Sequence, residues 1–431
     1  MLQAVRDPLG RSLELARRYG DTLTLPTLQG PLVLTSDPEA IKTLFTAPPE
    51  ALGPSAFDGL RDLFSGQSLL LMGGAEHRTA RRLLGPPFHG PRMRAYGPLI
   101  QAAAQRHLRA WPTGRRFALQ QKMQDISLDV IIGSLFGVTD DAGVQRFRDA
   151  LLAWFAALNQ AGLAVLFRAL RRPFGGLGPW AAYLRRRDQL FGLLQALIDT
   201  RRQGAPGDDI LSLLLAARTE DGPLADVDIM GHLITLTVAG METTAILLSW
   251  AAYGLLRHPA ALARLRAELA AAASTAGPTD PEALARLPYL DAVLNETLRR
   301  WPGTIAVTRR LHQPLRVAGH DLPAGTLVGA STLVHFRPDL YPDPLAFSPE
   351  RFLTLTPTPF TFLPFGGGAR RCIGAALATL EAKLVLAEVV AAPLRLAADR
   401  PLRPVLRALA LGPAGGVPVV LDPTSSPLTQ S

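Results

Sequence analysis

The sequence predicts a mainly α-helical protein with a small β region, folded as a single domain. Apolar residues recur at helical spacing over nearly all of residues 101–271, which indicates a large helical body. Short strand-like runs stand near the start, at 22–25 and 31–35, and return in the second half of the chain. A long, irregular, proline-rich passage at 337–363 comes next, and loops of that length usually serve a functional site.

The first elements are a β-hairpin and a helix. Residues 22–25 and 31–35 form two strand-like runs around a Gln-Gly turn, and Asp37 then opens a helix. The helical body that follows is interrupted by proline and glycine, chiefly at 173–179 and at 204–207. The hairpin predicts a small sheet near the start of the chain.

The second half mixes strands with the remaining helices. Strand-like pieces stand at 315–317, 326–328 and 417–421. None of the breaks resembles a flexible linker between domains. We therefore expect one domain over residues 1–431, with a short flexible tail at 424–431.

Composition excludes several classes of protein. Of the 431 residues 48% are hydrophobic, enough for an extensive core, and no uninterrupted apolar run reaches transmembrane length. A single cysteine rules out an intramolecular disulfide, and the first residues do not resemble a signal peptide, so we expect a cytoplasmic protein. The net charge of +9 comes from scattered arginines without a nucleic-acid motif, so we expect no nucleic-acid partner.

The single cysteine, Cys372, follows a glycine-rich stretch and precedes an apolar helical pattern that begins near Ala375. The amides and dipole of that helix and two flanking arginines favour a thiolate over a thiol. Glycines 366–368 let the backbone approach a flat ligand or fold its amides around the sulfur. The loop predicts a soft metal held by one sulfur; a buried structural cysteine and a catalytic nucleophile are the alternatives.

This loop resembles the cysteine-ligand loop of the cytochrome P-450 family. The constrained positions of that loop are filled here by Phe365, Gly368, Arg370, Cys372 and Gly374. The resemblance implies haem b (iron protoporphyrin IX) as cofactor and Cys372 as its iron ligand, with Gly366 also next to the haem. It implies the cytochrome P-450 fold and a monooxygenase, an oxidoreductase that inserts one atom of dioxygen into a substrate and reduces the other to water.

A second motif lies in the middle of the long apolar helix that opens at Asp226. It reads Ala-Gly-Met-Glu-Thr-Thr at 239–244. Glycine inside a helix costs about 1 kcal/mol relative to alanine, and close approach of another body is the usual reason for it. Helical spacing places Leu236, Gly240 and Thr243 on one face, where a flat cofactor and a small gas could lie. An ordinary buried helix with a solvent-facing glutamate is the alternative.

Together with the cysteine loop, this stretch resembles the oxygen-activating helix of the family. The acid and the alcohol of that helix correspond to Glu242 and Thr243. Reduction of dioxygen needs protons, so the resemblance gives Glu242 a proton relay and Thr243 a hydrogen bond to oxygen. It also implies a substrate pocket that includes Leu236, Ala239, Gly240 and Ile305.

A Glu-x-x-Arg pair, Glu296 and Arg299, stands on one face of a later helical pattern. An exposed pair of this spacing would be ordinary and would contribute little to stability. The family keeps such a pair at this place, with a further arginine from a Pro-Glu-Arg-Phe element that stands here at 349–352. We therefore expect Glu296, Arg299 and Arg351 to lock the scaffold of the cysteine loop without taking part in the chemistry.

Haem also carries two propionate groups that need cations. By resemblance the candidates are His77 and Arg81, which are one turn apart, together with Arg309 and Arg370. Arg310 replaces Arg309 if the register slips by one residue. A solvated surface arginine is the alternative for either position.

The segments that contact substrate in the family are almost entirely apolar in this chain. They favour a bulky lipophilic substrate, such as a terpenoid, a carotenoid or a fatty chain. The segment 163–172 combines an apolar stretch with arginines and could touch a membrane surface peripherally, although a helix packed in the core is the alternative.

Electrons are expected from outside the chain, since no dinucleotide fingerprint and no further cysteine is present. We expect a ferredoxin or flavodoxin, with Arg78, Arg82 and Arg371 as a positive patch for it. One rival function is a peroxide-driven or hydroperoxide-rearranging relative, which tends to lack the acid and the alcohol found here. The other rival is a non-catalytic haem-based gas sensor, against which the lack of a signalling segment argues.

Overall fold

The computed structural model of the chain describes residues 7–423, apart from 28, 55–67, 161–177, 206, 220–221, 277–279 and 408–409. These residues form two compact units. The first unit comprises Met1–Gly53, Met93–Ser127 and Met241–Ser431, and the second comprises Pro54–Arg92 and Leu128–Gly240. The predicted fold class is confirmed, because 59% of the described residues are helical and the β region is small. The boundaries predicted for a single domain and its tail stay a prediction.

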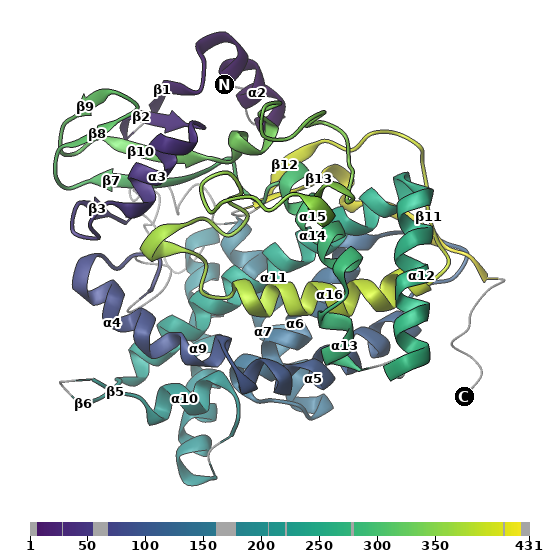
Figure 1. Cartoon of the computed structure of the whole chain (residues 1–431). Helices are drawn as coiled ribbons and strands as arrows, with labels where there is room; N and C mark the ends of the chain where they lie inside the picture. Colours follow the sequence, from purple (N-terminus) through teal and green to yellow (C-terminus); the bar gives the residue numbers. More distant parts are fainter. Residues whose placement is uncertain are drawn as a thin grey trace. The chain divides into compact units, whose positions relative to one another are not determined.

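The first unit contains a five-stranded sheet with the order β1-β2-β10-β7-β3. Its strands are β1 (Thr22–Thr27), β2 (Gly30–Thr35), β3 (Leu52–Gly53), β7 (Ala306–Leu311) and β10 (Leu327–Ser331). The first two strands form the predicted hairpin, in which Thr22 pairs with Thr35. β10 lies parallel to β2 and antiparallel to β7, so strands from both ends of the sequence share one sheet (Figure 1).

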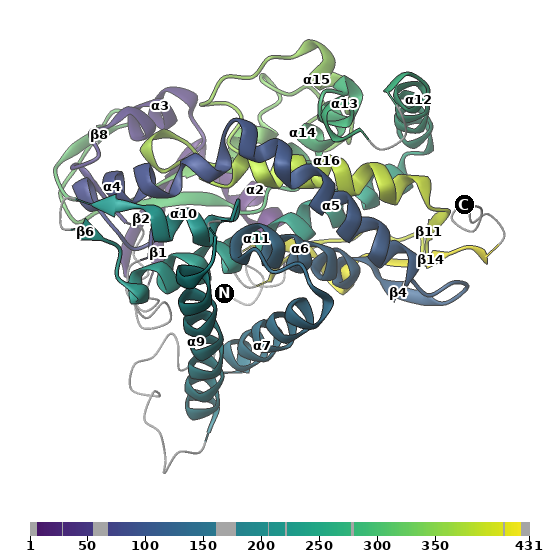
Figure 2. The same cartoon turned by 90° about the horizontal axis from the view of Figure 1, so that it is seen from below.

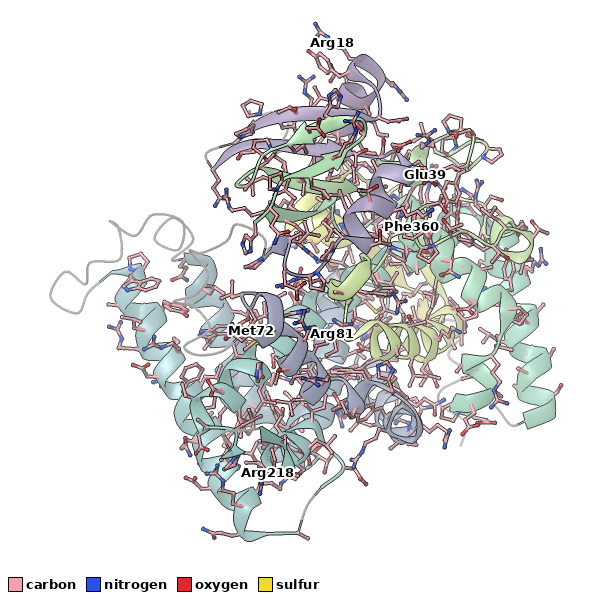
Figure 3. The ribbon with its side chains drawn as sticks, turned by 60° about the vertical axis from the view of Figure 1, so that its left-hand side comes forward. Arg18, Glu39, Met72, Arg81, Arg218 and Phe360 are labelled. Carbon is pink, nitrogen blue, oxygen red and sulfur yellow. The ribbon has the colours of Figure 1, made fainter. Side chains whose placement is uncertain are left out.

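Helix α3 (Pro38–Thr46) lies against β10 and forms a core with the sheet. As predicted, Asp37 opens the helix, and its carboxylate accepts a hydrogen bond from the amide of Ala40 at 2.8 Å. Ile41 and Leu44 of the helix are buried together with Leu363, from the end of the long irregular passage. Phe360 of the same passage packs against this cluster (Figure 3). The passage before the cysteine loop is therefore fixed to α3 by apolar packing.

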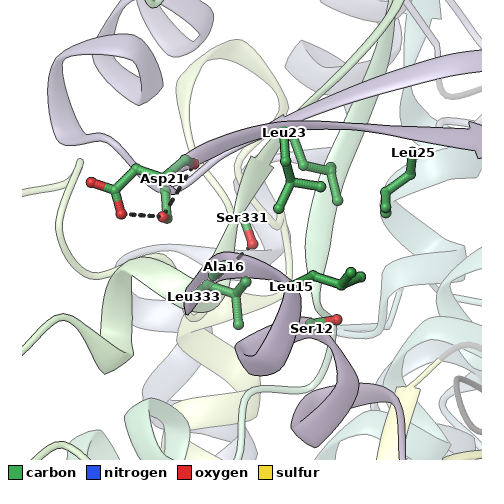
Figure 4. Close-up of a pocket in the computed structure, with 10 residues that line it drawn as sticks. Ser12, Leu15, Ala16, Asp21, Leu23, Leu25, Ser331 and Leu333 are labelled. Carbon is green, nitrogen blue, oxygen red and sulfur yellow. Dashed lines mark hydrogen bonds between the residues drawn. The ribbon is translucent and has the colours of Figure 1, made fainter. Parts of the chain in front are cut away.

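A small pocket lies between helix α2 (Pro8–Tyr19) and the sheet (Figure 4). Its lining is mainly apolar and includes Leu15, Leu23 and Leu333. None of its ten lining residues is a predicted site residue.

The remaining strands of the first unit form short ladders. They are β4 (Arg116–Ala118), β8 (Leu315–Val317), β9 (His320–Leu322), β11 (Leu394–Leu396), β12 (Pro404–Arg407), β13 (Ala410–Pro413) and β14 (Pro418–Leu421). Among them, β12 and β13 make an antiparallel hairpin near the end of the chain.

Helix α16 (Ala375–Ala391) begins three residues after Cys372 and packs against other helices of the first unit. They include α12 (Pro259–Ala276), α13 (Pro281–Ala285) and α14 (Pro288–Arg300), and α15 (Arg351–Thr354) packs against α14. Figure 1 and Figure 2 both show α14 beside α16. Two further helices, α5 (Pro91–Arg109) and α6 (Leu119–Phe136), belong to this unit through their residues 93–109 and 119–127.

Polar contacts fix α16 inside its apolar surroundings. The buried carboxyl of Glu381 accepts a hydrogen bond from the hydroxyl of Ser127 at 2.6 Å. The ammonium of Lys383 donates to the carbonyl of Ala285 at 2.6 Å. Near the end of the helix, Gln105 donates to Glu388 at 3.0 Å. From its middle onward, the helix that follows the cysteine loop is therefore held by polar contacts.

The second unit is built from helices. They are α4 (Gly74–Leu84), α7 (Asp141–Gln160), α9 (Pro179–Gln203) and α10 (Ile210–Ala216), with the short strands β5 (Arg218–Thr219) and β6 (Gly222–Pro223). Helices α7 and α9 lie side by side (Figure 2), and Trp154 of α7 packs near Tyr183 of α9. The guanidinium of Arg201 pairs with Asp209, the N-cap of α10, which joins α9 to α10. The segment 163–172, for which membrane contact was predicted, lies outside the described residues.

Helix α11 (Asp226–Arg257) is the longest described helix and carries the second motif. Among the described residues it alone is long and apolar enough to cross a membrane by length and composition, yet 72% of its most apolar stretch is buried. Buried helices in protein cores share this composition.

We predict that the stability of the protein falls with rising pH because of Glu381. Burial raises the pKa of Glu381 to about 8 from an ordinary value of 4.5, so the folded state holds a proton that the unfolded state loses. The stabilisation is complete below about pH 4.5 and is lost as the pH rises toward about 8. Glu381→Gln cannot ionise, so its free energy of unfolding should rise relative to the native protein over this range.

Denaturant titrations at a series of pH values measure the effect. Ser127→Ala is the matched control, because it removes the hydrogen-bond partner but leaves the titrating group in place. It should lower stability yet keep the pH slope. Equal slopes in the native protein and in Glu381→Gln would show that burial of this carboxyl does not set the dependence.

Candidate haem site

The cysteine loop is a tight turn that presents an exposed Cys372 at the start of α16. The amide of Cys372 donates to the carbonyl of Phe365 at 2.9 Å, which closes the loop. Inside it, the amide of Arg371 donates to the carbonyl of Gly368 at 3.1 Å. The cysteine therefore stands on a backbone that its own hydrogen bonds define, next to the positive end of a helix dipole.

The glycines of the loop serve two different purposes. Gly366 and Gly368 have φ values of +66° and +63°, which side chains rarely tolerate. A Cβ at Gly367 or Gly368 would also collide with Phe45 of α3, so the glycines allow the loop to pack directly on that residue. Gly374 differs, because φ is −85° and a Cβ there would meet no protein atom within 4 Å. The protein itself does not require glycine at 374, whereas a flat ligand near the sulfur would.

Two arginines converge near the loop. Burial, together with the positive charge of Arg370, lowers the pKa of Arg309 to about 10. Arg309, on β7, donates to the carbonyl of Thr308 at 2.6 Å, and no carboxylate pairs with it among the described residues. Two neighbouring cations in a partly buried place favour an anion between them. Arg310 instead donates to the carbonyl of Gly325 at 2.8 Å, so the structure favours Arg309 over Arg310 for this role.

These observations fit haem. An exposed thiol at a helix N-terminus suits iron, and a position at 374 without protein neighbours suits close approach of a flat ring. The like charges of Arg309 and Arg370 suit a propionate. All four residues belong to the first unit.

On α11, Ala239 and Thr243 are exposed, although Leu236, Met241 and Leu247 around them are buried. Ala239 and Thr243 are four residues apart and share a face of the helix. Gly240 makes its close contact elsewhere, because a Cβ there would lie 2.7 Å from Cδ1 of Ile131 on α6. Close approach of another body, the usual reason for a glycine inside a helix, is therefore met by α6, and the approach of a flat cofactor to this face stays a prediction.

Glu242 is half-buried and does not share the exposed face of Thr243. Its carboxylate accepts hydrogen bonds from the side-chain amides of Gln120, at 3.1 Å, and of Gln124, both on α6. Burial raises the pKa of Glu242, while the hydrogen bond from Gln124 and the positive charge of Arg407 oppose that rise. The acid is therefore held on one side of the helix and the alcohol stands on another.

The remaining predicted residues lie on separate elements. His77 is buried and Arg81, which is labelled in Figure 3, is half-buried. The two residues are one turn apart on α4 of the second unit. Ile305 precedes β7 and packs against the cluster of Leu9 and Leu333. The roles of His77 and Arg81 toward haem and of Ile305 toward substrate stay predictions.

The charged cluster around Glu296 is buried and fully bonded, as expected for a structural element. The guanidinium of Arg299 forms two hydrogen bonds with Glu296, at 2.7 and 2.8 Å, and Arg351 donates to Glu296 at 3.1 Å. Arg299 also donates to the carbonyls of His335, Pro344 and Ala346. The pair therefore ties α14 to the irregular passage that leads to Cys372.

Sequence reasoning missed several residues of this region. Phe45 lies far from the loop in sequence and carries no motif, and neither do Gln120 and Gln124, although their spacing of four residues places them on one helix face. The missed His335 accepts a hydrogen bond from the amide of Leu363 at 2.8 Å. Burial and the charge of Arg299 lower the pKa of His335 to about 3, which keeps its ring neutral for this bond.

We predict that Gly368→Ala damages the cysteine loop. A side chain at φ +63° is strained by about 1–2 kcal/mol, and its Cβ would also collide with the carbonyl of Phe45. The variant should have a lower melting temperature and bind less haem per protein, measured by thermal unfolding and by pyridine haemochrome absorption. Gly303→Ala is the matched control, because a Cβ there meets nothing within 4 Å. Equal haem content in the two variants would contradict the proposed packing.

Comparisons with known proteins agree with this site. The family model for cytochrome P-450 matches residues 2–392. A Mycobacterium tuberculosis protein provisionally named cytochrome P-450 135B1 is 40% identical over 387 residues, which cover 87% of this chain and 78% of that protein. The solved structure of cyanobacterial CYP120A1 bound to retinoic acid matches with a TM-score of 0.82 and 27% identity, over 95% of this chain and 93% of that one. The chain therefore belongs to the cytochrome P-450 family.

Proposed function

We propose that this chain is a haem-thiolate monooxygenase that hydroxylates or epoxidises a bulky lipophilic substrate. Members of the family contain haem and use dioxygen with electrons from a redox partner. The observation that carries the proposal is the exposed Cys372 in a self-bonded loop beside the like-charged pair of Arg309 and Arg370. No other cysteine exists in the chain to serve as the ligand.

Different residues of the chain would bind the iron and the propionate groups of the cofactor. When bound, haem supplies the redox chemistry that activates dioxygen. The Sγ of Cys372 would bind the iron, and the helix N-terminus of α16 supports the thiolate. Arg309 and Arg370 would hold a propionate, and by family resemblance His77 and Arg81 would hold the other.

Thr243 and Glu242 would manage hydrogen bonds and protons. Thr243 is an exposed residue of α11, and its hydroxyl would hydrogen-bond to dioxygen or water. Burial raises the pKa of Glu242. At a given pH a larger fraction of this carboxyl group therefore carries a proton, as a proton donor requires. The carboxyl would pass protons to the oxygen side from a fixed position.

A lipophilic substrate is supported by the apolar character of the proposed pocket residues Leu236, Ala239, Gly240 and Ile305. The structural relative with retinoic acid bound is further support, since retinoic acid is a long apolar molecule with one polar end. We infer a substrate of comparable size and polarity.

The electron donor is proposed to be a small acidic protein, a ferredoxin or a flavodoxin. Arg371, next to the cysteine, is exposed, and so are Arg78 and Arg82 on α4. Exposed arginines attract an acidic partner and orient it. The enzyme is proposed to act in the cytoplasm, where such donors occur.

The function is tested by spectroscopy of Cys372→Ser beside the native protein. The reduced native protein with carbon monoxide should show the absorption band of thiolate-ligated haem. Cys372→Ser should lose that band, because an alcohol is a far weaker ligand for iron. A native protein without haem, or a variant that keeps the thiolate band, would refute the ligand assignment.

We predict that Thr243→Ala uncouples oxygen consumption from product formation. Loss of the hydroxyl removes a hydrogen bond at the oxygen side but leaves apolar substrate contacts in place, so substrate should still bind. Peroxide released per NAD(P)H consumed should rise severalfold in assays with surrogate redox partners. Thr243→Ser, which keeps the hydroxyl, should behave like the native protein. Unchanged coupling in Thr243→Ala would remove this residue from the mechanism.

A further inference from the structure

Three side chains from two elements of the first unit act on the carboxylate of Glu242. Gln120 and Gln124, one turn apart on α6, each donate a side-chain hydrogen bond to it. Arg407, the last residue of β12, adds a positive charge that favours the ionised form. Thus both carboxylate oxygens are bonded, and the acid of α11 is held by α6 and by a hairpin near the end of the chain.

Two polar atoms of this group remain without a partner. The side-chain oxygen of Gln120 and Nε of Arg407 are buried and form no hydrogen bond among the described residues. The orientation of Gln120 is fixed, because its NH2 group donates to the carboxylate, so its other atom must be an acceptor. One unsatisfied acceptor and one unsatisfied donor belong to residues that both act on Glu242, and they are complementary. A water molecule in contact with both would satisfy them, since it accepts from one group and donates to the other.

Two glycines leave room for these side chains. A Cβ at Gly412 would lie 2.9 Å from Cδ of Arg407, and one at Gly416 would lie 3.5 Å from Cβ of Gln120. A Cβ at Gly412 would force Arg407 to shift, whereas one at Gly416 would make ordinary contact with Gln120. The hairpin and the turn after it therefore pack against Arg407 and Gln120 respectively.

We propose that Gln120, Gln124 and Arg407 are positioning residues that hold Glu242 and, with a bound water between Gln120 and Arg407, form a proton-supply site behind the oxygen-activating helix. This inference rests on the proposed monooxygenase function. The carboxyl of Glu242 gives its proton toward the oxygen side and regains one from the water. The water regains its proton from solvent, so that no group keeps a net charge.

The experiment compares product formation in the haem-loaded enzyme with surrogate redox partners. Gln124→Met and Arg407→Gln each remove one interaction with Glu242, so product per NAD(P)H should fall about tenfold, a modest part of what general acid catalysis supplies. Gln121→Met is the matched control, because Gln121 is the exposed neighbour of Gln120 on α6. Arg407→Lys keeps the positive charge and should retain most of the activity.

A pH profile separates positioning from a merely structural role. Both Gln124→Met and Arg407→Gln remove an interaction that favours the charged carboxylate, so the pKa that governs turnover should move upward. The solvent deuterium isotope effect on turnover should increase, since proton delivery becomes slower. Melting temperature and the thiolate spectrum with carbon monoxide should stay close to native, which shows that the fold and the haem are intact.

Double variants give the decisive result. In a Glu242→Gln background, Gln124→Met and Arg407→Gln should cause no further loss and no shift of the pH profile, because they act through Glu242. Additive losses in that background would overturn the inference, and so would a Glu242→Gln enzyme with native turnover. A native protein that lacks the thiolate spectrum or forms no product would refute the proposed function instead, so the two failures are distinguishable.

Discussion

The cysteine loop depends on a buried carboxylate, that of Glu296. A charged group that is buried away from solvent is tolerated only when it is paired and hydrogen-bonded. Here Arg299, Arg351 and the amide of Ser348 all donate hydrogen bonds to the carboxylate of Glu296. Arg299 is fully buried, and its other N–H groups donate hydrogen bonds to carbonyls of the irregular passage. Removing one member would leave an uncompensated charge in the core. This cluster therefore fixes a passage that has almost no regular structure of its own.

The same passage is then directed toward α3 and the sheet. The neutral ring of His335 accepts from the amide of Leu363, and Leu363 is buried against α3. The loop follows at once and rests on Phe45, which the absence of side chains at Gly367 and Gly368 allows. The position of the sulfur of Cys372 is thus set by a series of contacts that leads from α14 through the irregular passage at 337–363 to α3.

Two carboxyl groups of the first unit illustrate how partners decide the role of an acid. Glu381 has a single hydroxyl donor, and burial raises its pKa to about 8, so it is a neutral packing group with a hydrogen bond. Glu242 has two amide donors and a nearby arginine, which partly oppose the rise caused by burial. The number and charge of the partners therefore decide how far burial changes the pKa of a carboxyl group.

The sequence determined the fold class, the hairpin at the start and the cap at Asp37, and it singled out Cys372 as the candidate thiolate ligand. These follow from local patterns, namely hydrophobic period, turn residues and a motif of short range around Cys372. The Glu-x-x-Arg pair was also predictable, because its spacing of three is itself a helical contact.

Only the tertiary structure decided which distant residues meet. Phe45 lies under the glycines, Ile131 explains Gly240, and Gln120 and Arg407 reach Glu242 from far along the chain. No local pattern encodes such encounters, because packing brings together residues whose types are ordinary by themselves. The choice of Arg309 over Arg310 has the same origin: neighbours in sequence point to opposite faces of a strand, and only the folded sheet defines which face meets Arg370.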